Sequence, residues 1–272
     1  MEISLERIAE LERANYAATL PSAQITPTME VVLREDLVLT SSQAFPAPDT
    51  NHACLLRATP RSADELIGEV KDYFQSRGLP VAVYVSPVCT PHDLETRLKR
   101  SGFESMKEEE AWLVLNDLPD FDLPTPHPGV SVRVITEDKA MPFAQIFLAA
   151  FGWPMSVAPA MAHLLRPSIT LPNVNHYLAS CEHQPVGTCS LLRHGTFGVL
   201  GSVGVLQDHR RSGAATNLVV EALHQAQEDG IETVMLQTVA GTPLERLLRI
   251  SGFTTAFTRS CYVLSDASSD QN

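Results

Sequence analysis

The sequence predicts an α/β protein in which a mixed, mostly antiparallel sheet is flanked by helices and the chain forms two tandem lobes. Three observations indicate this: a proline-rich connector near the middle, an internal repeat, and a second half in which hairpins precede strand–helix–strand units. The length of 272 residues suits two domains, and the 44% hydrophobic and 19% charged fractions are those of a globular protein.

The connector lies at residues 119–129. It holds Pro119, Pro124, Pro126 and Pro128. Proline fixes φ and lacks an amide proton, so this segment is suited neither to a helix interior nor to a central strand. We therefore divide the chain into a first lobe at 1–118, the connector at 119–129 and a second lobe at 130–272.

The repeat relates the two lobes at an offset of about 150 residues. Residues 94–103 and 244–253 are identical at six of ten positions, and both end in Ser-Gly-Phe. An earlier pair of helical segments ends at Gly78 and Gly230. Glycine after a periodic apolar segment is typical of a helix C-cap. Since order, spacing and caps agree, we interpret the halves as copies of one unit.

Periodicity and turn signals predict the elements of each lobe. For the first lobe they give a helix at 4–18, a hairpin through 31–40, a strand at 52–57, a helix ending at Gly78, a strand at 80–85, a helix ending at Gly102 and a strand through Trp112. For the second lobe they give strands at 130–136, 174–181, 186–193, 197–206, 231–238 and 255–264, and helices at about 140–150, 156–165, 213–229 and 243–250.

Charge and cysteine usage exclude several classes of protein. The net charge is −12, and residues 1–128 contribute −10 of it. Nucleic-acid and anionic-membrane surfaces need clustered positive charge, so neither partner is expected. No apolar run approaches the roughly 20 residues of a membrane span. The five cysteines, scattered without a Cys-x-x-Cys or Cys/His cluster, indicate reduced thiols, a cytoplasmic location and no metal site.

The chemistry is concentrated in residues 203–215, where a strand ends, turns and opens a helix. The turn is basic, with His209, Arg210 and Arg211, and Gly213 begins an almost side-chain-free helical turn. A helix start exposes about four unpaired amides and a partial positive charge. Small residues there let an anion reach the backbone, so the segment predicts a phosphate cradle.

This pattern resembles the Gcn5-related N-acetyltransferase (GNAT) family. Arg210, Gly213 and Ala215 match its Arg/Gln-x-x-Gly-x-Gly/Ala signature, and Gly252-Phe253 resembles its last helix and turn. The resemblance covers residues 130–265 as a complete domain, with residues from about 25 to 118 as a degenerate copy. It implies tandem GNAT-like domains and acetyl-CoA as cosubstrate, without a metal. The implied CoA-binding residues are Val203, Gly204, Val205, Arg210, Arg211, Ser212, Gly213, Ala214, Ala215 and Thr216.

The resemblance also implies that the strand splays from its neighbour at 203–205. The backbone around Val205 would then hold the pantetheine arm and polarise the thioester carbonyl. The first lobe departs from the signature. There Ser62 and Glu65 form a predicted capping box that occupies the helix amides, so we expect no CoA in that lobe.

The usual proton-transfer residues of the family are missing. Its catalytic tyrosine position is Leu248, and the strand at 197–206 carries no carboxylate. Tyr262 and Ser202 are the candidate replacements, with His176 and His194 as further substitutes. Residues 151–155 line either an acceptor wall or an ordinary helix corner. Asp208 and the run Glu108-Glu109-Glu110 are interpreted as solvated.

The expected activity is transfer of an acetyl or other acyl group from acetyl-CoA to a primary amine, by direct attack in a ternary complex. The alternatives are a non-catalytic acyl-CoA sensor or scaffold, and decarboxylation or hydrolysis of an acyl-CoA on the same fold. The acceptor is a small molecule or a peptide, and the acidity of the chain favours a cationic one. Both a monomer and a homodimer are compatible with the sequence.

Overall fold

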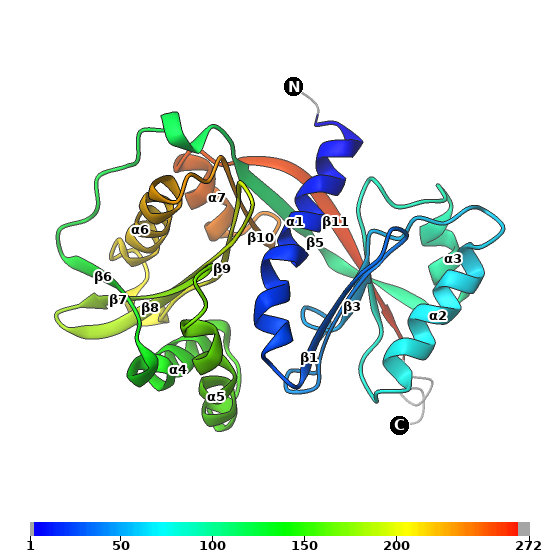
Figure 1. The fold of residues 1–272 in the computed structure, drawn as a ribbon, viewed down its shortest axis with the longest axis horizontal. Helices are drawn as coiled ribbons and strands as arrows, with labels where there is room; N and C mark the ends of the chain where they lie inside the picture. Colours follow the sequence, from blue (N-terminus) through cyan, green and yellow to red (C-terminus); the bar gives the residue numbers. More distant parts are fainter. Residues whose placement is uncertain (1–2, 266–272) are drawn as a thin grey trace.

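The computed structural model describes residues 3–265, whose eleven strands form one continuous sheet in the order β1-β2-β3-β4-β11-β5-β10-β9-β8-β7-β6 (Figure 1). The first lobe contains α1 (Leu5–Gln24), β1 (Met29–Leu33), β2 (Val38–Ser42), β3 (His52–Cys54), α2 (Ala63–Gln75), β4 (Ala82–Val85), α3 (Leu94–Arg100) and β5 (Phe103–Leu115). The second contains β6 (Val130–Val134), α4 (Ala140–Phe151), α5 (Ala158–Ile169), β7 (Val174–Cys181), β8 (Gln184–His194), β9 (Phe197–Val205), α6 (Ala214–Glu228), β10 (Thr233–Val239), α7 (Pro243–Ile250) and β11 (Thr254–Leu264).

The predicted fold class, a mixed sheet flanked by helices, is confirmed, and the elements occur in the predicted order. Two bounds differ. The first helix continues past residue 18 because Ala18 and Ala23 extend its buried face. The strand expected at 52–57 ends at Cys54, where Leu55 adopts a left-handed φ of +53° and interrupts the ladder.

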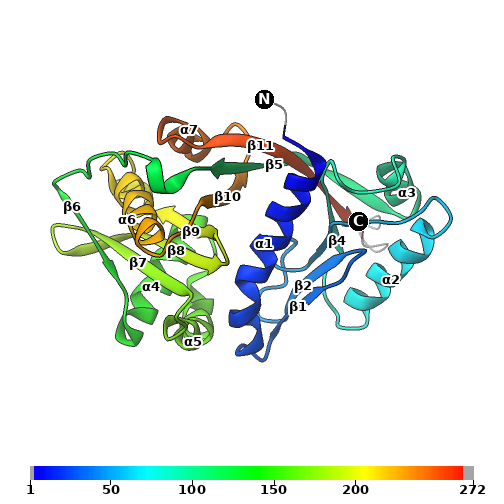
Figure 2. The ribbon, with the colours of Figure 1, turned by 45° about the horizontal axis from the view of Figure 1, so that its top comes forward.

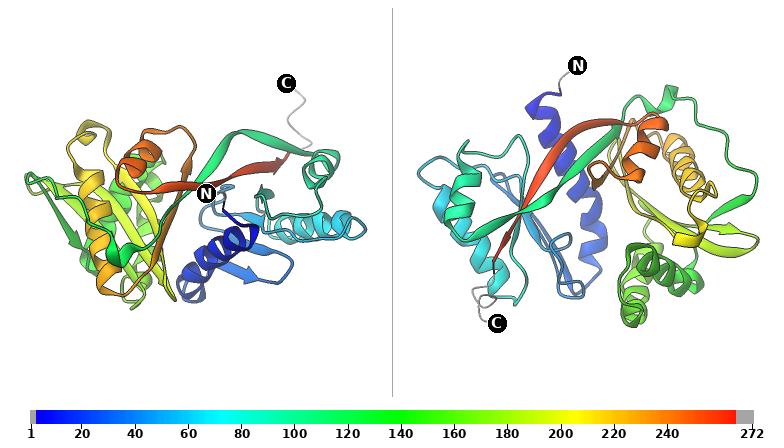
Figure 3. Two further views of the ribbon diagram at one scale, coloured as in Figure 1. Left: turned by 90° about the horizontal axis from the view of Figure 1, so that it is seen from above. Right: turned by 180° about the vertical axis from the view of Figure 1, so that it is seen from behind.

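The two lobes exchange their last strands. By the repeat, β5 corresponds to β11 and β4 to β10. Yet β11 pairs with β4, and β5 pairs with β10, while β5 and β11 run antiparallel beside each other. Figure 3 shows the two long strands bridging the halves of the molecule. Each lobe therefore completes its sheet with a strand from the other side of the connector.

The helices lie on both faces of this sheet. In the second lobe, α6 covers one face, where Leu218, Val219 and Leu223 enter a core with Val203 and Leu236. The opposite face of β8 and β9 contacts both α4 and the first-lobe helix α1, which lies between the lobes in Figure 2. The sheet thus presents one face that is shared by both lobes.

The connector is fastened along α6. Near the end of this helix, the Gln227 amide donates to the carbonyls of Leu118 and Phe121 at 2.7 and 2.9 Å. Near its start, Asn217 Nδ2 donates to the carbonyls of His127 and Val130, and Asn217 Oδ1 accepts the His127 amide at 2.7 Å. The prolines therefore cross the second lobe in a fixed path.

Candidate functional site

A split in the sheet separates β9 from β10. The two strands pair in parallel at only three positions, the last being Val199 with Met235. Beyond that point β9 continues to Val205 and β10 to Val239 without pairing to each other. The outward backbone groups of β9 past Val199 are therefore open toward the gap.

A β-bulge at Ser202 turns β9 at this opening. Ser190 pairs with Gly201 and Thr188 with Gly204, so β9 holds one extra residue, and Ser202 has a left-handed φ of +54°. The Thr188 hydroxyl donates to the Ser202 carbonyl at 2.7 Å. The Leu206 amide bonds back to Val186 on β8. Because strand groups alternate, the backbone of Val203 and Val205 faces the split.

The start of α6 lies next to this edge. Gly213 is the N-cap residue with a φ of +89°, and the Asn217 amide makes the first helical bond to its carbonyl. Ser212 Oγ accepts the Ala214 amide at 3.3 Å. The amides of Ala215 and Thr216 have no partner among residues 3–265, so unpaired donors and the positive end of the helix dipole meet here.

The basic turn directly precedes these donors in the chain. Arg210 and Arg211 are exposed, and neither forms an ion pair within the described chain. His127 of the connector packs against Gly213, where a Cβ atom would lie 2.7 Å from the His127 Cβ. The predicted CoA-binding residues thus form one continuous region: 203–205 are the open strand edge, 210–212 the turn, and 213–216 the start of α6.

The first lobe contains a similar bulged strand edge, but another segment of the chain is hydrogen-bonded to it. Its bulge residue Leu55 has a φ of +53°, which makes Leu56 and Ala58 the counterparts of Val203 and Val205. There the Thr90 amide donates to the Leu56 carbonyl at 2.9 Å, and the Ala58 amide donates to the Thr90 carbonyl at 3.2 Å. A segment of the chain itself therefore occupies the slot beside β3.

The predicted capping box in the first lobe is wrong. Ser62 has helical backbone angles and its hydroxyl turns back to Thr59, accepting the Thr59 amide at 3.2 Å instead of the Glu65 amide. A capping side chain needs an extended backbone at the N-cap, which the tight turn from Thr59 to Ser62 removes. The filled slot at Thr90 is the stronger obstacle to a ligand in this lobe.

Tyr262 does not lie at the split. Because β11 crosses to β4, Tyr262 is buried in the first-lobe core with Leu98 and Phe103, and its hydroxyl donates to Glu95 Oε2 at 2.8 Å. Burial and the neighbouring Glu95 raise the pKa of Tyr262 to about 12. The prediction of Tyr262 as a catalytic residue is therefore wrong, because the side chain lies in the core of the other lobe.

The other substitutes differ in position. Ser202 stays at the bulge and is half-buried. His176 is buried between Ser168 Oγ at 2.9 Å and Ser190 Oγ at 2.7 Å, and desolvation lowers its pKa to about 4. His194 is exposed at the far end of β8. Leu248 is fully buried in the apolar core, so the position that carries a tyrosine in the family supplies no hydroxyl.

Aromatic side chains gather on the face opposite α6. A Cβ atom on Gly204 would lie 2.8 Å from Phe151, which places this ring against β9 beside the split. The ring centroids of Phe147 and Phe151 lie 4.6 Å apart. Trp153 makes an edge contact with Phe45 of the first lobe, with 5.8 Å between the ring centroids. Residues 151–155 therefore belong to the shared face, and Phe45 was missed because no local pattern links it to them.

Within residues 3–265, no three His, Cys, Asp or Glu side chains are grouped so as to hold a metal ion. In the same part of the chain, every helix is too short or too polar to cross a bilayer.

Known proteins resemble the chain in family and in fold. The family model described as the acetyltransferase (GNAT) family matches residues 142–253. A GCN5-related N-acetyltransferase from Kribbella flavida superposes with a TM-score of 0.71 at 17% identity, over 98% of this chain and 97% of its own. A tandem GNAT protein from the clavulanic acid biosynthesis pathway superposes with a TM-score of 0.61 at 12% identity, over 93% of this chain and 88% of its own.

A GCN5-related N-acetyltransferase from Sphaerobacter thermophilus gives a TM-score of 0.61 at 18% identity, over 86% of this chain and 82% of its own. No curated protein matches the sequence. The structural likenesses establish a shared fold over nearly the whole length, and the family model matches the lobe that holds the split. The GNAT family match thus lies in the second lobe, and nearly the whole chain shares the fold of GCN5-related N-acetyltransferases.

Proposed function

We propose that the second lobe binds acetyl-CoA at the β9–β10 split and transfers the acetyl group to a primary amine. The observation that carries the proposal is the open edge at Val203 and Val205 beside the unpaired amides of α6. The first lobe supports it from within the chain, since an extended segment bonds to the equivalent atoms there through Thr90.

The residues divide the work as follows. The edge at 203–205 would pair with the amide groups of the pantetheine arm and direct a backbone N–H at the thioester carbonyl, where it stabilises the developing oxyanion. The amides at the start of α6, with Arg210 and Arg211, would hold the pyrophosphate. CoA supplies the activated thioester, and the chain orients it.

Transfer proceeds by direct attack. The amine nitrogen forms a bond to the carbonyl carbon, the C–S bond breaks, CoA leaves as the thiolate, and the proton lost by nitrogen returns to the thiolate or to water. Cys189, which lies beneath the bulge, is no nucleophile because burial raises its pKa to about 12.

Calorimetry with acetyl-CoA tests the binding. We expect Gly213→Glu to abolish binding and Arg210→Ala to weaken it by roughly tenfold, the loss of one charge-assisted contact. Arg133→Ala, an exposed arginine on β6, is the matched control. Hydrogen exchange should slow at 203–205 and 213–216 and stay unchanged at 56–66. Equal binding by all variants would overturn the site.

A non-catalytic acyl-CoA sensor is the second candidate. The burial of Leu248 and the lack of a carboxylate on β9 favour it. It predicts tight acetyl-CoA binding without thiol release over a broad panel of amines, whereas the transferase predicts thiol release that depends on the amine.

A further inference from the structure

One carboxylate of the first lobe lies on the shared face of β5, which is separated from β9 by β10 alone. Trp112, Val199 and Met235 enter one core together with α1, which identifies the face of the sheet opposite α6. Glu110 lies two residues before Trp112 on β5, so it points to the same face. It pairs with Val239 of β10, past the position where β10 separates from β9.

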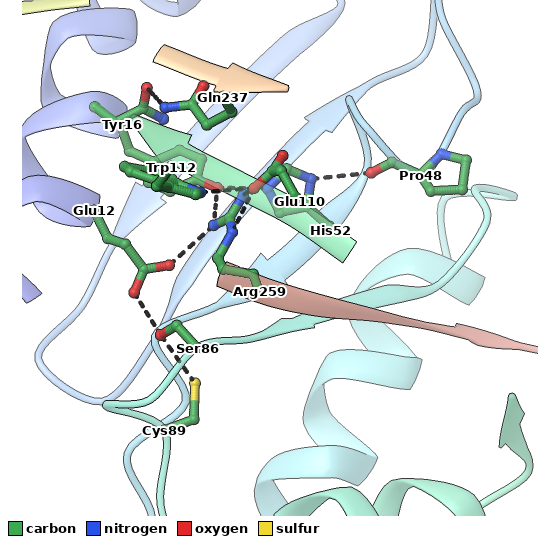
Figure 4. Close-up of polar contacts among 11 residues, drawn as sticks. Glu12, Tyr16, Pro48, His52, Ser86, Cys89, Glu110, Trp112, Gln237 and Arg259 are labelled. Carbon is green, nitrogen blue, oxygen red and sulfur yellow. Dashed lines mark hydrogen bonds and ion pairs between the residues drawn. The ribbon is translucent and has the colours of Figure 1, made fainter. Parts of the chain in front are cut away.

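Glu110 belongs to a buried polar cluster (Figure 4). Its Oε2 atom accepts hydrogen bonds from Trp112 Nε1 at 2.7 Å and from Arg259 Nε at 2.7 Å, and forms an ion pair with Arg259 Nη2 at 2.6 Å. Its Oε1 atom has no hydrogen-bond partner among the described residues, and 23% of the side chain is exposed. The carboxylate is thus fixed through Oε2, while Oε1 forms no hydrogen bond within residues 3–265.

The second carboxylate of the cluster is closed. Glu12 of α1 has no exposed surface, and its two oxygens bond to Ser86 Oγ at 2.6 Å and Arg259 Nη1 at 3.0 Å. A single guanidinium therefore faces two carboxylates. His52 adds no positive charge, because burial and then Arg259 lower its pKa to about 3. Burial raises the pKa of Glu12, so the carboxylate that the cluster presents toward solvent is that of Glu110.

We propose that Glu110 binds a positively charged group of the acceptor at the transfer site of the second lobe, so that the acceptor is a diamine or polyamine. The inference rests on the proposed function. A carboxylate stabilises the ammonium form of the nitrogen that it holds, and an ammonium has no lone pair for attack. The reacting amine is therefore a second nitrogen of the same molecule.

The spacing of the strands fits such an acceptor. β5 and β9 are separated by one strand, β10, which puts their backbones about 10 Å apart or more where the gap opens. A chain of about five carbons carries two nitrogens far enough apart to reach from Glu110 toward the thioester. The exchange of β5 into the second lobe is what brings this carboxylate within reach.

A matched pair of amines tests the inference. With saturating acetyl-CoA, 1,5-diaminopentane and 1-aminopentane are compared by thiol release. We expect the wild-type protein to favour the diamine by at least tenfold in kcat/KM. Glu110→Gln, which keeps an oxygen for Trp112 and Arg259, should remove that preference by raising the KM for the diamine. Glu109→Gln, on the opposite face of β5, should behave like the wild type.

Further measurements keep the outcomes apart. Val239→Lys places an ammonium on the 40% exposed cross-strand neighbour of Glu110 while every side chain of the buried cluster is kept, and should likewise raise the diamine KM. Calorimetry should show equal acetyl-CoA binding by the wild type and both variants. Absent binding by the wild type overturns the proposed function and this inference with it.

Acetyl-CoA binding with no diamine preference, or with one that survives Glu110→Gln and Val239→Lys, overturns this inference alone. If neither amine is turned over, calorimetry of 1,5-diaminopentane on the CoA-loaded protein decides: loss of binding in Glu110→Gln supports the assignment, and equal binding overturns it.

Discussion

Arg259 Nη1 lies 3.0 Å from Glu12 Oε1, joining β11, the last strand along the chain, to the first helix in the core. Arg259 also donates to the Tyr16 hydroxyl at 3.1 Å. Its guanidinium carbon lies 4.7 Å from the centroid of the Trp112 ring and 4.5 Å from that of Tyr84. One side chain therefore joins α1, β4, β5 and β11, the elements that the exchange brings together.

Removing this guanidinium should be costly. Arg259→Met leaves Glu12 and Glu110 without their cation, and we expect a loss of about 3–5 kcal/mol in urea unfolding. Arg34→Met is the control, because its ion pairs with Asp36 and Glu69 are largely exposed and contribute less than about 1 kcal/mol. Equal losses in the two variants would contradict a central role for Arg259.

Gly213 is required for two separate reasons. Gly213→Ala forces a left-handed alanine, which costs about 1 kcal/mol, and sets a Cβ atom 2.7 Å from His127, which adds about 1–3 kcal/mol. Gly195→Ala has the same backbone strain with nothing within 4 Å. Adding His127→Gly to Gly213→Ala should recover only the free energy lost to the contact with His127. The measurement is the free energy of unfolding of the three single variants and of the Gly213→Ala/His127→Gly double variant. If the effects of the two substitutions in the double variant are additive, the contact does not contribute.

His176 should lower the stability of the folded protein as the pH falls. The unfolded state takes up a proton below pH 6.5, whereas the folded state resists it down to about pH 4. Stability due to neutral His176 is therefore present above pH 6.5 and lost as the pH falls to 4, by up to about 3 kcal/mol. His176→Asn should flatten this part of the stability profile, while His194→Gln at an exposed site should not. If the stability of His176→Asn still falls steeply in this pH range, another group is responsible for the loss.

Cutting the connector should not separate the lobes. A protease site inserted at the exposed Thr125 would yield two pieces that each carry a strand of the other's sheet. We expect the pieces to elute together in gel filtration and to unfold in one transition. Elution as two smaller species would show that the exchanged strands contribute little to association.

The elements and the loop at 203–216 could be predicted from sequence because their signals are local. Alternating residues mark strands, and Gly213 with Ala214 and Ala215 marks an open helix start. The exchange of β5 and β11 could not be predicted. The repeat makes the two strands alike, and strand order depends on contacts between residues about 150 positions apart.

The errors at the site follow from that exchange. Tyr262 was assigned to the lobe that contains it in sequence, but β11 carries it into the other core. Glu110 was interpreted as solvated because it ends a run of three acids, and only the buried Arg259 distinguishes it from Glu108 and Glu109. Ser62 fits a capping motif by residue type, and the motif fails on the backbone angles of the turn.

The position of β11 also sets the order in which the protein is completed during synthesis. β4 and β5 leave the ribosome first, but β11, between them in the sheet, is made more than 130 residues later. Until then the nascent first lobe exposes two unpaired strand edges and an acidic pair, Glu12 and Glu110, without its cation. Chaperone binding during translation should thus persist until Arg259 emerges.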